Sequence, residues 1–519
     1  MKSSSLYSGA GHIAGQRLAN CVNRHASQQQ PNHDHLRHVQ SLLVFILLLL
    51  QAVPVYSDEL DEKWHALEFG DVVMYTDLET SDAQALAQHV VEFRAVLDQA
   101  LPQALKPLAD APKLRLLVFK RRADFAKLMK PQHFAAFTQS SLKETLLVIA
   151  PSKTRSTLFS NTRHELVHYQ LRNQNVGFPP WYDEGVAVML EHTTLQSSSG
   201  SVALTSDLES LYGMYRGPIE RLGFGDLRQL TEATDFRRWP HQKLTWFYGL
   251  SGQFVHYLTS AHNDELKEFL QHQDQGLAAA LGRPLFRVEK DFSRHRKSRE
   301  QAPWFSSAPL ENVEVYRRAM RASEVTLVHA RAAENANPRR AIRLYRSIVA
   351  KHPDRAAARI NLARGYIAHR DYDNASKALD AASRLLDSPS AQYLVLRAML
   401  KLRDCGSMGS GECRDVWSAT SKLLRQALDV DPGELEGIFL LGVVDLYRGR
   451  PGSALNYLRA IHRYVPWAPR VNYHLGECLR ILGDPTAVIY LRNALAWSHD
   501  EEWVNLSEAS LKLLEETGS

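Results

Sequence analysis

Two histidines and a glutamate have the spacing of a metal-binding helix. Residues 164–168 read His-Glu-Leu-Val-His. Side chains four positions apart lie on one face of an α-helix, so His164 and His168 can reach the same tetrahedral cation. Glu165 would then lie beside the cation, where a carboxylate takes a proton from a metal-bound water. The pentapeptide predicts a Zn²⁺-dependent hydrolytic centre.

A third protein ligand is expected, because catalytic zinc typically has three protein ligands and one position open to water. Glu184 follows His168 by sixteen residues, within the run Trp-Tyr-Asp-Glu-Gly at 181–185. Asp183 is the rival ligand. Neighbouring side chains on a helix point about 100° apart, so only one of the two can face the metal well. We predict Glu184.

The segment between the two motifs contains strong turn signals. Gly177 and the proline pair at 179–180 interrupt the chain, and residues 181–192 then show apolar positions at helical spacing. A second helix is therefore expected to pack across a short turn from the first. Glu191 lies two helical turns after Glu184 and would accept a hydrogen bond from a ligating imidazole.

The same pentapeptide also occurs by chance on ordinary helices, whose histidines are merely exposed or satisfied in the core. Here an apolar, β-rich run at 145–150 precedes it, and a helix-borne glutamate follows at a workable distance. This context favours a zinc centre.

Both motifs together resemble a known family. His-Glu-Leu-Val-His followed by Trp-x-x-Glu-Gly-x-Ala is similar to the gluzincin metallopeptidases, and among them to the bacterial Peptidase MA-like domains, over roughly residues 64–295. The resemblance implies an α+β zincin-like fold. It also implies zinc bound by His164, His168 and Glu184, with Glu165 as the catalytic base.

Tyr248 begins an aromatic stretch, 248–258, similar to the helix that follows the zinc core in these proteins. In related aminopeptidases a tyrosine at a comparable distance stabilises the oxyanion, which implies a catalytic role for Tyr248. The alternative is a core aromatic, because Trp246, Phe247 and Tyr257 lie nearby in sequence. The Gly-Ala-Met-Glu-Asn motif of those aminopeptidases is absent from the sequence, so their specificity is not expected.

The amino-terminal part of the peptidase region alternates strands and helices. Strands are expected at 72–75, 114–119 and 146–149, with helices near 81–105 and 122–130. Strands ahead of a zinc helix commonly offer an edge for an extended substrate. The Ser/Thr/Gly-rich segment 193–206 is expected to be a loop.

The first 57 residues have the features of a secretory signal. A nine-residue apolar run at 42–50 is too short for a membrane span, which needs about 20 apolar residues. Cleavage is predicted near Ser57, which fits the preference for a small residue at the cleavage site, after an unusually long polar start. We expect a secreted or periplasmic protein without a stable membrane span once the signal is cleaved. An uncleaved signal anchor is the alternative.

A repeat fills the carboxy-terminal part. Positions thirty-four residues apart carry the same residue types, namely Pro432 and Pro466, Gly442 and Gly476, and Gly449 and Gly483. This period resembles the tetratricopeptide repeat, in which small residues let paired helices approach and stacking buries their apolar faces. About five units fit. They imply an all-α solenoid with a surface for a protein partner; the alternative is a purely structural extension.

Four segments follow from these patterns: a signal peptide at 1–57, a peptidase domain at 58–300, a linker at 301–311 and a repeat domain at 312–519. The net charge of +5, with 23% charged residues, is too balanced for nucleic-acid binding without a basic and aromatic stripe.

Two cysteines flank a glycine-rich and serine-rich segment. In an oxidising compartment Cys405 and Cys413 would form a disulfide; two free thiols are the alternative. Cys478 is expected to be a buried apolar residue.

Together these patterns predict a zinc metalloendopeptidase that hydrolyses peptide or protein substrates and binds a partner through its repeats. The rival is a scaffold or adaptor whose peptidase domain is inactive or regulatory. Retention of His164, Glu165, His168 and Glu184 favours the enzyme.

Overall fold

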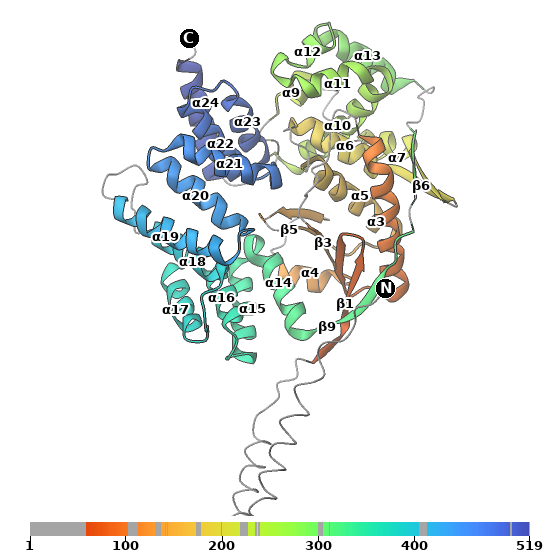
Figure 1. The fold of residues 1–519 in the computed structure, drawn as a ribbon. Coiled ribbons are helices and arrows are strands. Elements are labelled where there is room, and N and C mark those ends of the chain that lie inside the picture. Colours follow the sequence, from red (N-terminus) through yellow and green to blue (C-terminus); the bar gives the residue numbers. More distant parts are fainter. Residues whose placement is uncertain are drawn as a thin grey trace, which may run out of the picture. The chain divides into compact units, whose positions relative to one another are not determined.

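A computed structural model gives the fold (Figure 1). It describes residues 59–101, 113–129, 136–140, 142, 144–172, 178–198, 200–217, 219, 227–233, 236, 239–298, 305–310, 312–403, 413–498 and 501–517. The expected signal peptide and Cys405 lie outside these ranges. None of the described helices is long and apolar enough to span a membrane.

A six-stranded sheet forms the amino-terminal part, with strand order β4-β5-β3-β2-β1-β9. Its strands are β1 (Leu60–Phe69), β2 (Val72–Thr76), β3 (Lys113–Val118), β4 (Ala136–Ser140), β5 (Glu144–Ile149) and β9 (Tyr316–Arg321). The inner strands β2, β3 and β5 are parallel, and the others pair antiparallel with their neighbours. The strands expected from apolar runs are therefore confirmed.

The two faces of this sheet belong to two apolar cores. On β3, Leu114 and Leu116 pack in the core beneath the zinc-motif helices, whereas Leu117 packs in a second core with α14 and α15 of the repeat region. Side chains alternate across a strand, and burial on both faces explains why β3 and β5 read as nearly continuous apolar runs.

A smaller sheet, β6-β7-β8, corrects one expectation. Its strands are β6 (Thr193–Ser198), β7 (Ser201–Ser206) and β8 (Phe305–Pro309). The segment 193–206 is thus a β-hairpin, and the prediction of a loop was wrong. Val202 and Leu204 alternate with more exposed neighbours along β7 and are buried. Burial of these alternating apolar side chains stabilises the strand despite its serine and threonine content.

Helices surround these sheets. Those before the repeats are α3 (Thr80–Ala100), α4 (Arg122–Leu128), α5 (Arg155–Arg172), α6 (Pro180–Glu191), α7 (Leu208–Gly213), α9 (Leu227–Thr231), α10 (His241–Ala261), α11 (Asn263–Gln271), the 3-10 turn η2 (Gln273–Gln275), α12 (Leu277–Ala280) and α13 (Leu285–Lys297). The zinc motif lies on α5, and the Trp-x-x-Glu-Gly motif lies on α6.

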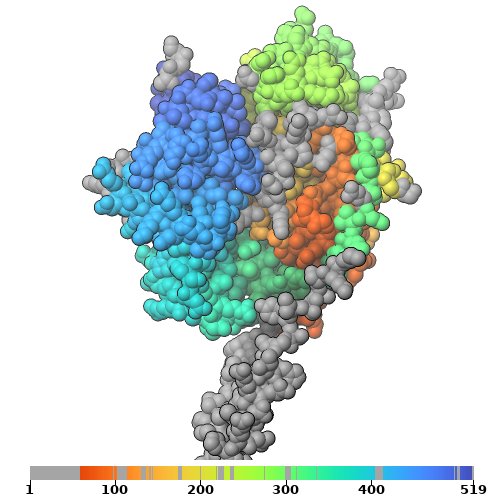
Figure 2. Space-filling view, in the orientation of Figure 1, coloured from red at the N-terminus to blue at the C-terminus, as the bar shows by residue number. Residues whose placement is uncertain are grey.

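Eleven described helices follow β9, as five antiparallel pairs and a final helix (Figure 1). They are α14 (Ala322–Ala336), α15 (Pro338–Lys351), α16 (Ala356–Ala368), α17 (Tyr372–Ser383), α18 (Ala391–Leu402), α19 (Arg414–Val430), α20 (Leu435–Tyr447), α21 (Pro451–Tyr464), α22 (Pro469–Ile481), α23 (Ala487–Trp497) and α24 (Glu501–Thr517). In the space-filling view, α15 to α24 cover one continuous surface, coloured cyan to blue (Figure 2).

The periodic glycines have two different structural roles. A Cβ on Gly442 would approach Leu458 Cγ to 3.0 Å, and one on Gly476 would approach Leu491 Cγ to 2.7 Å, so these glycines let paired helices pack closely. Gly449 and Gly483 have φ values of +70° and +71°, which favour glycine at the turn between paired helices. Both uses recur because each pair repeats the same contact and the same turn.

The junction between the two regions contains strands. The expected linker 301–311 contributes β8 to the smaller sheet, and β9, from the segment assigned to the repeats, pairs with β1 in the larger one. A chain cut at residue 303 would therefore lose a strand from each sheet.

Candidate metal centre

Helices α5 and α6 bring the predicted ligands together. His164 and His168 lie one turn apart on α5, and Glu184 lies near the start of α6, which begins at Pro180. Their ligating atoms all lie within 4.8 Å of one another. The Nε2 atoms of the two imidazoles are 3.1 Å apart, and Glu184 Oε2 lies 3.6 Å from that of His164 and 3.4 Å from that of His168.

This triangle has the dimensions of a zinc site. In a tetrahedron with ligands 2.0 to 2.2 Å from zinc, neighbouring ligand atoms are roughly 3.3 to 3.6 Å apart. The three observed separations lie close to this range without any rearrangement. Two imidazole nitrogens and one carboxylate oxygen are also the donor types that catalytic zinc prefers. The residues therefore fit the predicted ion in geometry and in chemistry.

Two further carboxylates orient the imidazoles. His164 Nδ1 lies 3.0 Å from Glu191 Oε2, and His168 Nδ1 lies 3.0 Å from Asp183 Oδ1. Each carboxylate accepts a hydrogen bond from Nδ1–H and so leaves Nε2 of the neutral ring free to bind a metal. Glu191 occupies the orienting position expected for it. Asp183, weighed as a rival ligand, instead faces the outer nitrogen of His168.

Buried carboxylates dominate the electrostatics of the centre. Burial alone would lower the pKa of His168, but the charges of Asp183 and Glu184 outweigh it and raise this pKa to about 9. His164 behaves in the same way: against the effect of burial, hydrogen bonds to Glu184 and Glu191 raise its pKa well above the usual value. For Glu184, burial opposes ionisation, yet the adjacent imidazoles hold its pKa well below the usual range. The centre thus has strong affinity for positive charge.

Glu165 is next to the ligand triangle in sequence but is not a member of it. The residue is buried, and its Oε2 accepts a hydrogen bond from Thr138 Oγ1 at 2.6 Å. Thr138 lies on β4, an edge strand that pairs only with β5 among the described strands. Sequence reasoning missed Thr138, because a pairing between an edge strand and a distant helix leaves no periodic signal.

Close helix packing fixes the position of Glu184. A Cβ on the adjacent Gly185 would lie 2.7 Å from the carbonyl oxygen of Ser251 and 2.6 Å from Val255 Cγ2, both on α10. In return, a Cβ on Gly252 of α10 would lie 2.6 Å from Val188 Cγ1 of α6. Glycine at 185 is therefore required for α6 to contact the α10 backbone directly.

Tyr248 and Tyr215 are the tyrosines relevant to an oxyanion role. The half-buried Tyr248 has its ring edge-on to Phe236 and Phe247, with centroid distances of 6.2 and 6.0 Å. Tyr215, which sequence reasoning missed, packs on Gly249 of α10. Burial raises the pKa of Tyr215, and the negative charges of Glu191 and Glu184 raise it further. Tyr215 therefore interacts electrostatically with two carboxylates of the centre.

The cysteines follow the expected division. Cys413 is disulfide-bonded, and Cys405, its expected partner, lies outside the described residues. Cys478 is a free, buried thiol, as predicted.

Comparison with known proteins identifies the repeats. Residues 332–400 match the family described as "Tetratricopeptide repeat", so the helical region contains repeats of this type. Together with the helix pairs, this match confirms the predicted TPR-like solenoid. The described amino-terminal region is α+β, and its more specific zincin-like assignment stays a prediction. No curated protein matches the sequence.

Several solved tetratricopeptide proteins are similar to part of the chain. TTC0263, a thermophilic TPR protein of Thermus thermophilus, is 15% identical, with a TM-score of 0.32, over 37% of this chain and 100% of its own. YrrB, "a TPR protein with an unusual peptide-binding site", is 16% identical, with a TM-score of 0.25, over 36% of this chain and 90% of its own. A tetratricopeptide repeat protein from Parabacteroides merdae is 11% identical, with a TM-score of 0.29, over 58% of this chain and 99% of its own.

Proposed function

We propose that this tetratricopeptide protein is a secreted, zinc-dependent metalloendopeptidase that binds a protein partner through its repeats. The triangle of His164, His168 and Glu184 carries the enzymatic part of the proposal, because its dimensions match those of a zinc site. The adjacent buried Glu165 supports a hydrolytic role, since it is a base beside a metal site and not one of its ligands.

The residues of the centre have distinct roles in this proposal. Bound zinc would polarise the scissile carbonyl and lower the pKa of a bound water. Glu165 accepts a proton from the attacking water and delivers it to the leaving amine. Asp183 and Glu191 hold both imidazoles with Nε2 toward the metal.

The position of strand β4 supports the proposal that the substrate is a peptide. Its outer edge is unpaired among the described strands, and an extended peptide can add to such an edge by main-chain hydrogen bonds. Thr138 of this strand contacts Glu165, so a peptide paired with β4 would lie near the base. Thr138 also restrains the carboxylate before substrate arrives.

Tyr248 is proposed as the oxyanion donor, with Tyr215 as the competing candidate. Tyr248→Phe removes only a hydroxyl and should lower kcat about 10²-fold with little change in stability. Tyr215→Phe is the matched substitution. Loss of turnover only in Tyr215→Phe would transfer the role to Tyr215.

The test of activity measures zinc content and cleavage of an unstructured protein such as casein. The wild-type chain should bind one zinc ion and cleave casein. Glu165→Gln should keep the zinc and lose about 10³-fold or more in kcat, because the amide cannot accept the proton. Comparable cleavage by this variant would remove the proposed mechanism.

A second candidate function is a protein-binding adaptor whose metal centre is catalytically inactive. The family match favours it, since it lies within the repeats. The same measurement distinguishes the two candidates. Zinc binding without any cleavage of unstructured proteins would support the adaptor.

Secretion is proposed on the apolar run at 42–50. The disulfide at Cys413 agrees with an oxidising compartment. Amino-terminal sequencing of the exported protein should find a start near residue 58.

A further inference from the structure

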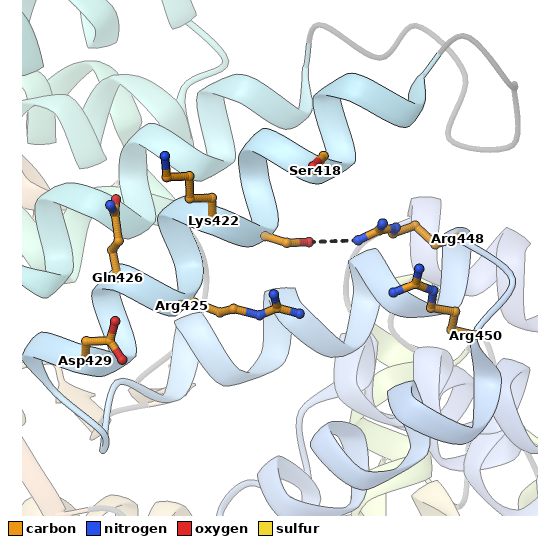
Figure 3. Close-up of a pocket in the computed structure, with 8 residues that line it drawn as sticks. Ser418, Lys422, Arg425, Gln426, Asp429, Arg448 and Arg450 are labelled. Carbon is orange, nitrogen blue, oxygen red and sulfur yellow. Dashed lines mark hydrogen bonds between the residues drawn. The ribbon is translucent and has the colours of Figure 1, made fainter.

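A basic pocket lies between α19 and the turn that joins α20 to α21 (Figure 3). Its volume is about 400 Å³. The lining residues are Ser418, Ser421, Lys422, Arg425, Gln426, Asp429, Arg448 and Arg450. Four of these side chains are cationic and one is anionic. Figure 3 shows the guanidinium groups of Arg425, Arg448 and Arg450 extending into the space between the two elements.

These cations lack the carboxylate partners that some other arginines of the repeats have. Arg448 donates a hydrogen bond to Ser421 Oγ at 3.4 Å, and no ion pair joins Arg425 or Arg450 to a carboxylate among the described residues. Elsewhere in the repeats, Arg470 pairs with Glu436 and Arg480 with Glu477. The pocket therefore has three more cationic than anionic side chains, and its arginines form no ion pair within the described part of the chain.

Arg450 also replaces a residue type that would stabilise the helix after it. It occupies the N-cap of α21 without a side-chain hydrogen bond to the helix. In two other helix pairs the same position holds Asn337 or Asp371, whose side chains accept from the backbone of α15 and α17. One repeat later in the sequence stands Asp484. An arginine here forgoes a cap and places positive charge at the positive end of the helix dipole.

We propose that this pocket binds an acidic segment of a protein partner. Guanidinium groups pair bidentately with carboxylates, and cations from two elements can engage successive acidic side chains of one segment. The serine hydroxyls lining the pocket can donate further hydrogen bonds to carboxylate oxygens. The proposal rests on the protein-binding role proposed for the repeats and is independent of the metal centre.

The test uses the full chain and fluorescein-labelled hexaglutamate, followed by fluorescence anisotropy. Hexaglutamate should bind, hexaglutamine should not, and the affinity should fall as salt rises. Arg425→Glu combined with Arg450→Glu should weaken binding at least about tenfold. Arg339→Glu combined with Arg343→Glu, at two exposed positions on α15, is the matched charge control and should bind like the wild type. Circular dichroism verifies that each variant is folded.

A second variant separates binding from folding. Arg450→Asp should weaken hexaglutamate binding while raising the Tm by about 2 °C, because the aspartate caps α21. Unchanged binding in both pocket variants would overturn the proposal. So would equal affinity for hexaglutamate and hexaglutamine, or inorganic phosphate as the only anion bound there.

The catalytic variant distinguishes this proposal from that of the peptidase. Glu165→Gln should bind hexaglutamate like the wild type, and the pocket variants should keep their zinc and their cleavage of casein. Failure of acidic-peptide binding with intact cleavage would thus overturn the pocket alone.

Discussion

Buried histidines occur in both regions of the molecule, with opposite affinities for protons. His168 in the candidate metal centre and His474 in the repeats are nearly equally buried, with 6% and 5% of their surface exposed. Asp183 and Glu184 raise the pKa of His168 to about 9 against the effect of burial. For His474, burial lowers the pKa to about 3, and the charge of Arg470 acts in the same direction.

The surroundings of the two imidazoles explain this difference. His474 is surrounded by the rings of Phe439, Tyr447, Tyr473 and Trp503, at centroid distances of 5.1 to 6.0 Å. Its Nδ1 is buried without a hydrogen-bond partner among the described residues. Burial therefore does not identify a metal ligand. Carboxylates on both ring nitrogens are the feature that separates His168 from His474, because they prepare an imidazole to hold positive charge.

The largest expected effect comes from removing the charge that distinguishes the centre. Glu184→Gln keeps the shape of the side chain but removes the anionic ligand, so zinc affinity should fall on the order of 10³-fold. Competition with a chromophoric chelator measures this loss. His474→Gln is the control and should retain wild-type zinc affinity. An equal loss of zinc affinity in both variants would mean that the affinity depends on general folding and not on the triangle of His164, His168 and Glu184.

A smaller effect is expected from Asp183, the carboxylate that contacts Nδ1 of His168. Asp183→Asn keeps an oxygen near His168 Nδ1 and removes the charge, so zinc affinity should fall about 10-fold to 100-fold. The same chelator competition measures it. A loss as large as that of Glu184→Gln would instead indicate that Asp183 binds the metal directly.

A further effect concerns folding stability and the histidine in the repeats, His474. Its folded-state pKa lies below the unfolded value of about 6.5, so the unfolded chain binds the proton more readily. Stability from neutral His474 is present above pH 6.5 and is lost as the pH falls toward 3. The loss should reach about 2 kcal/mol at pH 5.

His474→Phe should flatten this dependence, because a phenylalanine fills the aromatic site without a titrating group. Urea unfolding at pH 7 and pH 5 compares the variant with the wild type. The same slope with pH in both proteins would assign the acid sensitivity to other groups, such as His462, whose pKa burial lowers to about 4.

Local periodicity explains which parts of the centre could be predicted from the sequence. The positions of His164 and His168 follow from one helical turn, and that of Glu184 from a second helix after a proline turn. The orienting role of Asp183 depends on how two helices cross, which no spacing along one helix gives. The contact of Thr138 with Glu165 depends in addition on the pairing of β4 in the sheet.

For the fold, too, elements with a local sequence pattern could be predicted, whereas elements that depend on distant partners could not. Apolar runs predicted β2, β3 and β5, and the thirty-four-residue period predicted the repeats. Strands β8 and β9 pair with partners far away in the sequence, so the segment of β8 was predicted as a linker and that of β9 as part of the repeats. In β7, serine and threonine content outweighed the alternation of Val202 and Leu204 in our prediction.

The contact of Gly185 with α10 has a consequence for the exchange of zinc at the proposed site. Glu184 lies on a helix whose next residue, Gly185, packs directly against the Ser251 carbonyl and the Val255 side chain of α10. A ligand on so stiff a support cannot relax away when the ion departs. Under the proposed function, a protein stripped of zinc by a chelator should therefore stay folded, keep this arrangement of ligands and recover activity as soon as zinc is returned.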